Sequence, residues 1–260
     1  MHTNKDIGRG WTPALPEAMK CISWNCRGLR NQATVQELAN LVQIKDPSIL
    51  FLSKTWMDED RLEILRCCFH FSNKFVVKRI NKGGGLVLFW KHDCNLSICS
   101  YSLSHIDSIV DNNSDLLWRL TCFYGAPETH LREQSWNLLR TLNSQHSLPW
   151  CCFGDFNEIV WNSEKSGRRE QSERQMQGFW AAIDDCGFLD LGFRGLPFTW
   201  CNNRHGNATT WLRLDRCMAT NDWVPSCLVQ LSHQATWNPI FHNQIIWYNI
   251  HQWKINICEH

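Results

Sequence analysis

The stretch Leu148-Pro-Trp-Cys-Cys-Phe-Gly-Asp-Phe-Asn-Glu158 decides the fold. Its apolar run, residues 150–153, is typical of a short buried strand. Gly154 is expected to end this strand in a sharp turn, because glycine accepts backbone angles that other residues avoid. If the backbone stays extended beyond the turn, the side chains of Asp155 and Asn157 share one face.

A carboxylate and an amide at a strand end suit phosphate chemistry. Asp155 can take a proton from water or hold a cation. Asn157 can donate a hydrogen bond to a phosphate oxygen or fix the attacking water. The alternative is an Asx-type turn that only closes the strand. On this stretch alone the turn is the favoured interpretation.

Two further segments place a polar side chain at the end of an apolar strand. Ser23-Trp-Asn-Cys-Arg-Gly-Leu29 does so with Asn25, and Trp211-Leu-Arg-Leu-Asp-Arg216 does so with Asp215. Three such ends in one chain favour a shared site over three unrelated turns.

Together these motifs resemble the endonuclease/exonuclease/phosphatase superfamily, and in particular the endonuclease domain of plant LINE-type (non-LTR) retrotransposons. The resemblance covers about residues 19–232, and its motifs occur in the family's order. It implies an α/β fold, a four-layer sandwich of two packed mixed β-sheets flanked by helices (deoxyribonuclease-I-like). It also implies phosphodiester hydrolysis with Mg²⁺ or Mn²⁺, and DNA, or RNA, as partner. The remaining matching motifs are Gly84-Gly85-Leu86, Phe123-Tyr124-Gly125 and Phe198-Thr199-Trp200.

The resemblance implies four catalytic residues. Asp155 matches the aspartate that activates water, and Asn157 matches the amide that stabilises the transition state. Tyr124 matches the tyrosine that contacts phosphate, and Asn25 the asparagine that orients the metal carboxylate or the phosphate. Each also has a structural explanation, as a turn residue, a strand-end amide or a tyrosine at the edge of the core.

The same comparison implies metal and phosphate contacts. Asp215 and Asn25 match positions near the metal, although Asp215 could simply pair with a neighbouring arginine. Thr199 and Asn157 match phosphate-binding positions. The family's main metal ligand, a glutamate at the end of the second strand, is replaced here by Lys54. This exchange of a carboxylate for an ammonium should repel a divalent ion.

The second departure lies near the C-terminus. Thr236 stands where the family has an aspartate, and Trp237 where it has a histidine. Loss of one member of such a unit typically reduces the rate by orders of magnitude, and further losses add little. His233 and His242 lie nearby but lack the partner aspartate, so we expect neither to replace the lost histidine.

Composition is consistent with one intracellular domain. The chain has 260 residues, 43% of them hydrophobic and 20% charged, which is enough for a sizeable core. The net charge of +1 gives no strong global attraction to nucleic acid, so such binding must rest on local charge. The 14 cysteines include no C-x-x-C, and several lie in apolar runs (Cys21, Cys122, Cys151, Cys152). This pattern favours reduced, buried thiols over disulfides or a zinc site.

Hydrophobic periodicity predicts alternating strands and helices. Strand 20–24 should be followed by a helix that Asn31 caps and that ends at Asp46-Pro47, and then by strand 48–53. A helix over 62–69 precedes an antiparallel meander. Further helices are predicted over 133–142 and 175–186, around a polar loop at 163–174. The predicted meander strands are 75–80, 86–90, 96–100, 106–110 and 117–124.

The ends of the chain differ from its middle in composition. Residues 1–18 lack periodicity and are expected to form a disordered leader. Residues 19–232 form the predicted domain, and 233–260 a divergent tail that replaces the family's last motif. No stretch is apolar enough to span a membrane, and the N-terminus lacks a signal-peptide core. We therefore expect a nuclear or cytoplasmic location.

Four functional hypotheses remain at this point. The leading one is a DNA-nicking domain of retrotransposon origin whose activity is weak or absent because of Lys54, Thr236 and Trp237. A second is a metal-independent nucleic-acid or phosphate-binding module, in which Lys54 supplies the missing positive charge. A third is a remnant without selected function, unstable because of its tail. The fourth is an active phosphatase of small phosphate esters. The lost glutamate counts against this activity as much as against a nuclease.

Overall fold

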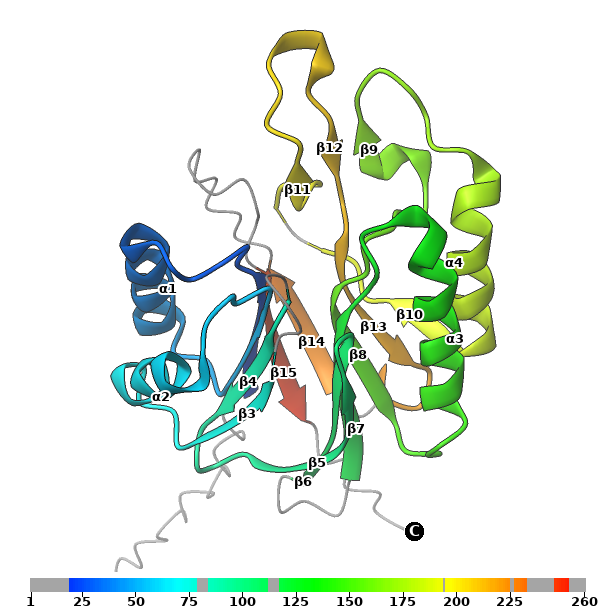
Figure 1. The fold of residues 1–260 in the computed structure, drawn as a ribbon. Helices are drawn as coiled ribbons and strands as arrows, with labels where there is room; N and C mark the ends of the chain where they lie inside the picture. Colours follow the sequence, from blue (N-terminus) through cyan, green and yellow to red (C-terminus); the bar gives the residue numbers. More distant parts are fainter. Residues whose placement is uncertain are drawn as a thin grey trace, which may run out of the picture.

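The computed structural model describes residues 19–78, 84–111, 117–193 and 195–224 (Figure 1). For two later strands, 227–232 and 246–252, it describes the backbone alone. The predicted leader, Thr236 and Trp237, His233 and His242 lie outside the described residues.

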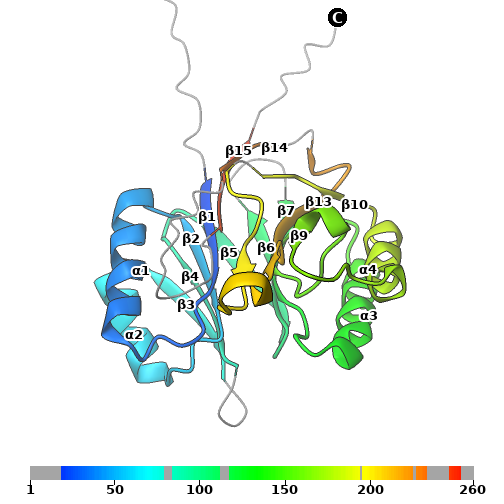
Figure 2. The same cartoon turned by 90° about the horizontal axis from the view of Figure 1, so that it is seen from above.

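Two six-stranded mixed sheets pack face to face, with a pair of helices on the outer face of each (Figure 2). The first sheet has the order β14-β15-β1-β2-β4-β3, and the second β10-β13-β8-β7-β6-β5. The predicted α/β four-layer sandwich is therefore confirmed. The first sheet's strands are β1 (Met19–Asn25), β2 (Ile49–Ser53), β3 (Asn73–Val77), β4 (Leu86–Trp90), β14 (Cys227–Ser232) and β15 (Ile246–Gln252). The second sheet's are β5 (Asn95–Ser102), β6 (His105–Asp111), β7 (Leu117–Tyr124), β8 (Trp150–Asp155), β10 (Phe188–Asp190) and β13 (Asp215–Thr220).

A small three-stranded sheet, in the order β11-β12-β9, rises above one end of the sandwich (Figure 1). Its strands are β9 (Lys165–Ser166), β11 (Trp200–Cys201) and β12 (Trp211–Leu212). Three short 3-10 turns accompany the strands, namely η1 (Thr129–Leu131), η2 (Asn162–Glu164) and η3 (Gly206–Ala208).

The helices sit where the sequence predicts them. The first sheet is covered by α1 (Gln32–Lys45) and α2 (Glu59–Cys68), and the second by α3 (Arg132–Asn143) and α4 (Glu173–Asp185). Asn31 caps α1 by accepting a hydrogen bond from the backbone N–H of Ala33, and Asp46 ends it in a left-handed conformation (φ 46°).

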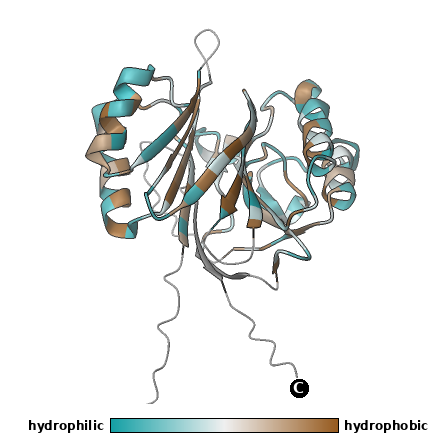
Figure 3. Cartoon of the chain, turned by 90° about the horizontal axis from the view of Figure 1, so that it is seen from below, coloured by the Kyte–Doolittle hydropathy of each residue, from teal (hydrophilic) through white to brown (hydrophobic). Residues whose placement is uncertain are grey.

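Burial of apolar side chains holds the layers together. One cluster fills the space between the two sheets. A second lies between the first sheet and its helices, and a third between the second sheet and its helices. Figure 3 shows strands that are largely hydrophobic and helices with one hydrophobic and one hydrophilic side. The four cysteines predicted to be buried all are, and the cysteines of the described part are free thiols. No helix among the described residues is long and apolar enough to cross a membrane.

Three expectations about the strands require correction. The predicted meander is divided between the sheets, because β3 and β4 pair in the first sheet while β5, β6 and β7 pair in the second. Gly154 does not end its strand. Its backbone continues β8 to Asp155 and pairs with Arg216, and a Cβ there would lie 1.9 Å from the carbonyl oxygen of Phe123. Asp215 begins β13 instead of ending a strand.

One strand lies within the segment predicted as a tail. β15 pairs antiparallel with β1 on one side and with β14 on the other. This backbone pairing places residues 246–252 inside the first sheet.

Strand direction brings the polar strand ends together. β1 and β2 run parallel with Asn25 opposite Ser53, and β7 and β8 run parallel with Tyr124 opposite Asp155. The antiparallel β13 starts at the same edge, with Asp215 opposite Asp155. Parallel strands end at one edge of a sheet, so these side chains share one end of the sandwich.

Candidate functional site

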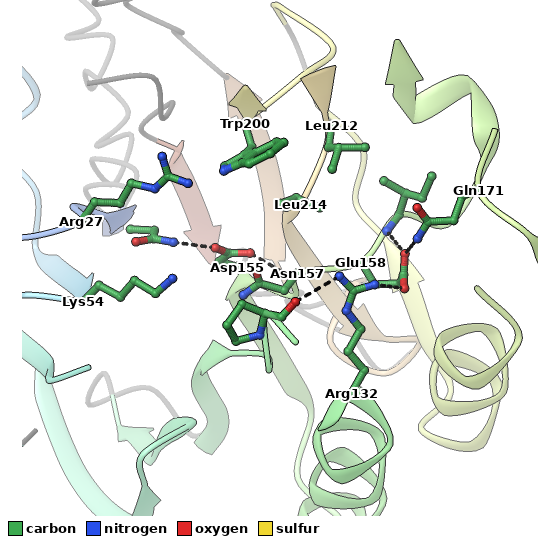
Figure 4. Close-up of a pocket in the computed structure, with 13 residues that line it drawn as sticks. Arg27, Lys54, Arg132, Asp155, Asn157, Glu158, Gln171, Trp200, Leu212 and Leu214 are labelled. Carbon is green, nitrogen blue, oxygen red and sulfur yellow. Dashed lines mark hydrogen bonds and ion pairs between the residues drawn. The ribbon is translucent and has the colours of Figure 1, made fainter. Parts of the chain in front are cut away.

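Asp155 and Asn25 join the two sheets at this end. Asn25 Nδ2 donates a hydrogen bond of 2.7 Å to Asp155 Oδ2, although the residues are 130 positions apart. Both side chains are buried, and both line a cavity of about 220 Å³ (Figure 4). The bond fixes the carboxylate with respect to the cavity.

Asn157 forms the Asx turn that the sequence left as an alternative. Its backbone N–H donates to Asp155 Oδ1 at 2.9 Å, and its φ of 54° is left-handed. The extended continuation beyond Asp155 is therefore wrong. The turn nevertheless brings Asn157 to the cavity wall, where its Nδ2 donates to the carbonyl of Gly125 at 2.8 Å.

Asp215 lies behind Asp155 and is almost fully buried. Its Oδ1 makes no hydrogen bond among the described residues. Burial, and then the charge of Asp155, raise the pKa of Asp215 well above its ordinary value, while the Thr199 hydroxyl lowers it. Burial likewise raises the pKa of Asp155, and Asn25 and Lys54 act in the opposite direction. The two carboxyl groups therefore resist being ionised together.

Lys54 follows β2 with a left-handed backbone (φ 53°) and extends into the cavity (Figure 4). Its Nζ lies 5.1 Å from the centroid of the Tyr124 ring. Burial lowers the pKa of Lys54, Asp155 raises it, and Arg27 lowers it further. Lys54 takes part in none of the ion pairs among the described residues.

Tyr124 ends β7 and is buried, with 8% of its surface exposed. Burial and the neighbouring Asp155 raise its pKa strongly, so its hydroxyl stays protonated at neutral pH. Thr199 is also buried, and its Oγ1 accepts hydrogen bonds from the backbone N–H groups of Leu214 and Asp215 at 2.9 and 3.0 Å. Thr199 thus fixes the start of β13, and its predicted phosphate contact stays a prediction.

The sequence missed several residues that line the cavity. Arg27 extends over the Trp200 ring, with 5.7 Å between its Cζ and the ring centroid. Glu158 is fully buried in the wall, where Arg132 and Gln171 donate hydrogen bonds to its carboxylate. Arg27 and Glu158 stand within quoted motifs, so a closer inspection of those motifs could have found them. Trp200 also belongs to a quoted motif, Phe198-Thr199-Trp200, whereas nothing in the sequence pattern marks Arg132.

The acidic residues that follow Lys54 do not replace the lost glutamate. Asp58 caps α2 by accepting from the backbone N–H of Arg61 at 3.0 Å. Glu59 pairs with Lys78 at 3.0 Å, and Asp60 is exposed on the helix. None of the three lines the cavity.

The donor set fits a divalent cation poorly. Asp155, Asp215 and Asn25 are oxygen donors of the kind that Mg²⁺ and Mn²⁺ prefer. The charge in the cavity opposes a metal ion, however. The ammonium of Lys54 shares the cavity, and a unit positive charge 4 Å from another costs about 4 kcal/mol at an effective dielectric of about 20. Thr236 and Trp237 lie outside the described residues.

Comparison with known proteins identifies the fold's relatives. The model of the "Endonuclease/Exonuclease/phosphatase family" matches residues 22–235. The chain belongs to this family. Family members generally depend on divalent metal ions. No curated protein matches the sequence significantly.

Solved structures with this fold include several nucleases. The endonuclease domain of TRAS1, a telomere-specific non-LTR retrotransposon, aligns at 13% identity and a TM-score of 0.65, over 91% of this chain and 100% of that one. An AP endonuclease from Archaeoglobus fulgidus aligns at 14% identity and a TM-score of 0.67, over 88% of this chain and 98% of that one. The 3'-5' exonuclease NExo from Neisseria meningitidis aligns at 17% identity and a TM-score of 0.64, over 90% of this chain and 100% of that one. At these identities the likeness shows the fold alone.

Proposed function

We propose that this family member is a DNA-nicking endonuclease-type domain of retrotransposon origin whose metal-dependent hydrolysis is weak or absent. Support for the ancestry comes from the motif order and from the likeness to the TRAS1 endonuclease domain. DNA is the proposed partner, and another structure with this fold was solved "bound to product DNA hairpin".

The observation that carries the proposal is Lys54 in the cavity beside Asp155. A nuclease of this kind needs a metal ion to neutralise phosphate charge while a carboxylate activates water. Here a fixed cation stands where a carboxylate ligand would be. Asp155 remains a possible base, and Asn157 and Tyr124 remain available to phosphate. The replacements at Thr236 and Trp237 act in the same direction.

A second candidate function is metal-independent binding of nucleic-acid phosphate. Two cations, Lys54 and Arg27, line the cavity, and neither forms an ion pair among the described residues. The charge of Arg27 lowers the pKa of Lys54. Like charges that form no ion pair favour an incoming anion.

One set of variants tests both functions. The set is the wild-type chain, Lys54→Glu, the triple variant Lys54→Glu/Thr236→Asp/Trp237→His, and the control Arg61→Glu. The control makes the same charge change on the exposed outer face of α2. Supercoiled plasmid with Mg²⁺ or Mn²⁺ reports nicking, and single-stranded and duplex DNA in EDTA report binding.

We expect nicking by the triple variant and at least about 100-fold less by the wild type and by Arg61→Glu. In EDTA we expect the wild type and Arg61→Glu to bind DNA, and Lys54→Glu to bind at least about 10-fold more weakly. Robust nicking by the wild type would show that another group holds the metal. No DNA binding by the wild type at low salt would remove the second candidate.

A further inference from the structure

Three side chains with metal-ligating atoms meet on the helix-covered face of the second sheet, outside the cavity. They are Cys99 of β5, Asp107 of β6 and His146 of the loop between α3 and β8. Their ligand atoms all lie within 4.8 Å of one another. Two neighbouring strands and a loop more distant in sequence therefore converge on one point.

Cys99 lies at a β-bulge of β5. Ile98 pairs with Ser108 and Ser100 with Asp107, so Cys99 is the extra residue of β5 and has no partner in the ladder. Bulges redirect single side chains in this way and are frequent at functional sites. Cys99 is exposed, and its thiol makes a weak contact of 3.6 Å with the carbonyl oxygen of Ser97.

Asp107 is held rigidly at the centre of the group. Its carboxylate is fully buried and accepts hydrogen bonds from Arg119 at 2.9 to 3.0 Å and from the Thr121 hydroxyl at 2.5 Å. Arg119 is fixed in turn by donating to the carbonyl of Leu142 at the end of α3 at 2.5 Å. Hydrogen-bonded carboxylates of this kind are typical of metal sites, where outer partners orient the ligand.

His146 completes the group from the solvent side. It follows the C-terminal end of α3 by a few residues, so the contact between Arg119 and α3 also positions its loop. The imidazole is exposed and makes no hydrogen bond or ion pair among the described residues. It is free to turn toward a ligand, and the exposed side of the group offers an entry path.

We propose that Cys99, Asp107 and His146 bind one divalent cation of the zinc type, with water as the fourth ligand. Thiolate, imidazole and carboxylate are the ligands that zinc accepts, and three protein ligands with a water form a familiar set. Zinc–ligand bonds of about 2.0 to 2.3 Å place tetrahedral ligand atoms about 3.3 to 3.6 Å apart. The observed limit of 4.8 Å requires adjustments of about an ångström, which the two exposed side chains can make.

The charges at the site set its expected strength. Binding replaces the thiol proton of Cys99, which passes to solvent, by the metal. Asp107 and the thiolate contribute two negative charges, and the nearby Arg119 guanidinium opposes the cation. We therefore expect weaker binding than at a site built from several cysteines. Mg²⁺ is disfavoured, because it prefers oxygen ligands throughout.

The test uses Co²⁺ as a spectroscopic probe for zinc, with the full-length chain in a phosphine reductant. A cysteine thiolate bound to Co²⁺ gives an intense charge-transfer band, which Co²⁺ bound through oxygen or imidazole alone does not give. Binding in the main cavity therefore does not contribute, because no cysteine lines it. The variants are Cys99→Ser and His146→Gln, with Cys68→Ser and His92→Gln as controls at exposed positions elsewhere.

We expect one equivalent of Co²⁺ to produce the band, and Zn²⁺ to abolish it by displacement. Cys99→Ser should eliminate the band, and His146→Gln should weaken Co²⁺ binding at least about 10-fold. The controls should match the wild type. The proposal is overturned if the wild type gives no band, if the band survives Cys99→Ser, or if the controls lose it equally. Unchanged melting curves of the two variants without metal would exclude unfolding as the cause.

Discussion

At the residue scale, the buried pair of Asp155 and Asp215 shows that residues of the site reduce the stability of the fold. The two residues face each other across β8 and β13, and both are almost inaccessible to water. The pKa of Asp215 is raised well above its ordinary value, because burial and the charge of Asp155 both disfavour its ionised form. A buried carboxylate that forms no ion pair lowers the stability of the fold, so its presence indicates a chemical role.

Replacing Asp215 by asparagine should therefore stabilise the protein at neutral pH. In the unfolded chain Asp215 ionises near 3.8, whereas in the folded chain its pKa is raised well above that value. Ionisation of Asp215 therefore costs the wild type stability as the pH rises from about 4 toward the folded-state pKa, and the variant lacks this contribution. We expect equal melting temperatures at pH 3 and a higher melting temperature for Asp215→Asn near pH 7. Each 1 kcal/mol of unfavourable free energy that the substitution removes should raise the melting temperature by about 2 to 4 °C.

Thermal melting followed by circular dichroism across this pH range measures the difference. Asp184→Asn, at an exposed position of α4, is the matched control and should show no such pH-dependent gain. A lower melting temperature of Asp215→Asn at neutral pH would contradict the account and would mean that the carboxylate has a stabilising partner.

At the element scale, β8 depends on a close approach to β7. Gly154 has a φ of 146°, which other residues rarely adopt, and its Cα faces the backbone of Phe123. A Cβ on Gly125, just beyond β7, would lie 2.4 Å from the carbonyl oxygen of Phe156. The two glycines let the strand ends that carry Tyr124 and Asp155 pack against each other.

Gly154→Ala should destabilise the protein by several kcal/mol, on the order of 3 or more, because the new Cβ overlaps a backbone oxygen that cannot move aside. Gly187→Ala serves as the comparison. Gly187 also has a positive φ of 62°, but a Cβ there meets no atom within 4 Å. It should cost only about 1 to 2 kcal/mol, from backbone strain. Urea denaturation midpoints measure both changes, and equal losses would show that strain alone decides.

At the scale of the whole molecule, the last described strand completes the first sheet. β15 lies between β1 and β14 and pairs with both along most of its length. β14 pairs with no other strand among those described. The integrity of the sheet therefore depends on residues that their sequence sets apart as a divergent tail.

A chain truncated after residue 232 should lose stability substantially, since β14 loses its partner and the edge of β1 becomes exposed. The full chain should melt in one cooperative transition, and the truncated chain at a temperature at least about 10 °C lower or without a transition. Differential scanning calorimetry of both chains measures this. A full chain that melts without cooperativity would favour a remnant that does not fold, and identical melting of the two would show that β15 contributes nothing.

Local patterns predicted the elements well, and tertiary relations were harder to predict. Residues 86–90 and 117–124 were placed at their observed bounds, because each is an apolar run between polar turns. The division of the meander between two sheets was missed, since a hairpin has the same pattern in either sheet. The start of β13 at Asp215 was missed because the apolar residues Trp211, Leu212 and Leu214 precede it and are typical of a strand that ends there.

For the site, the sequence predicted the side chains that end or begin central strands. Asn25, Asp155 and Asn157 line the cavity, and Lys54 does so as the expected intruding cation. Arg132 could not be found, because it reaches the cavity from a helix that no motif connects to it, and Trp200 was overlooked although it stands in a quoted motif. The group of Cys99, Asp107 and His146 was missed for a related reason, since its members are too widely spaced to form a recognisable pattern.

The hydrogen bond between Asn25 and Asp155 has a consequence for synthesis on the ribosome. The second sheet is built from one continuous segment, residues 95–220, and can pair its strands as soon as that segment emerges. The first sheet opens with β1 and closes with β15, so its first strand waits for its last neighbour through nearly the whole of translation. The cavity needs both sheets. A nascent chain released before residue 246 would therefore carry every residue that lines the cavity but an unfinished first sheet.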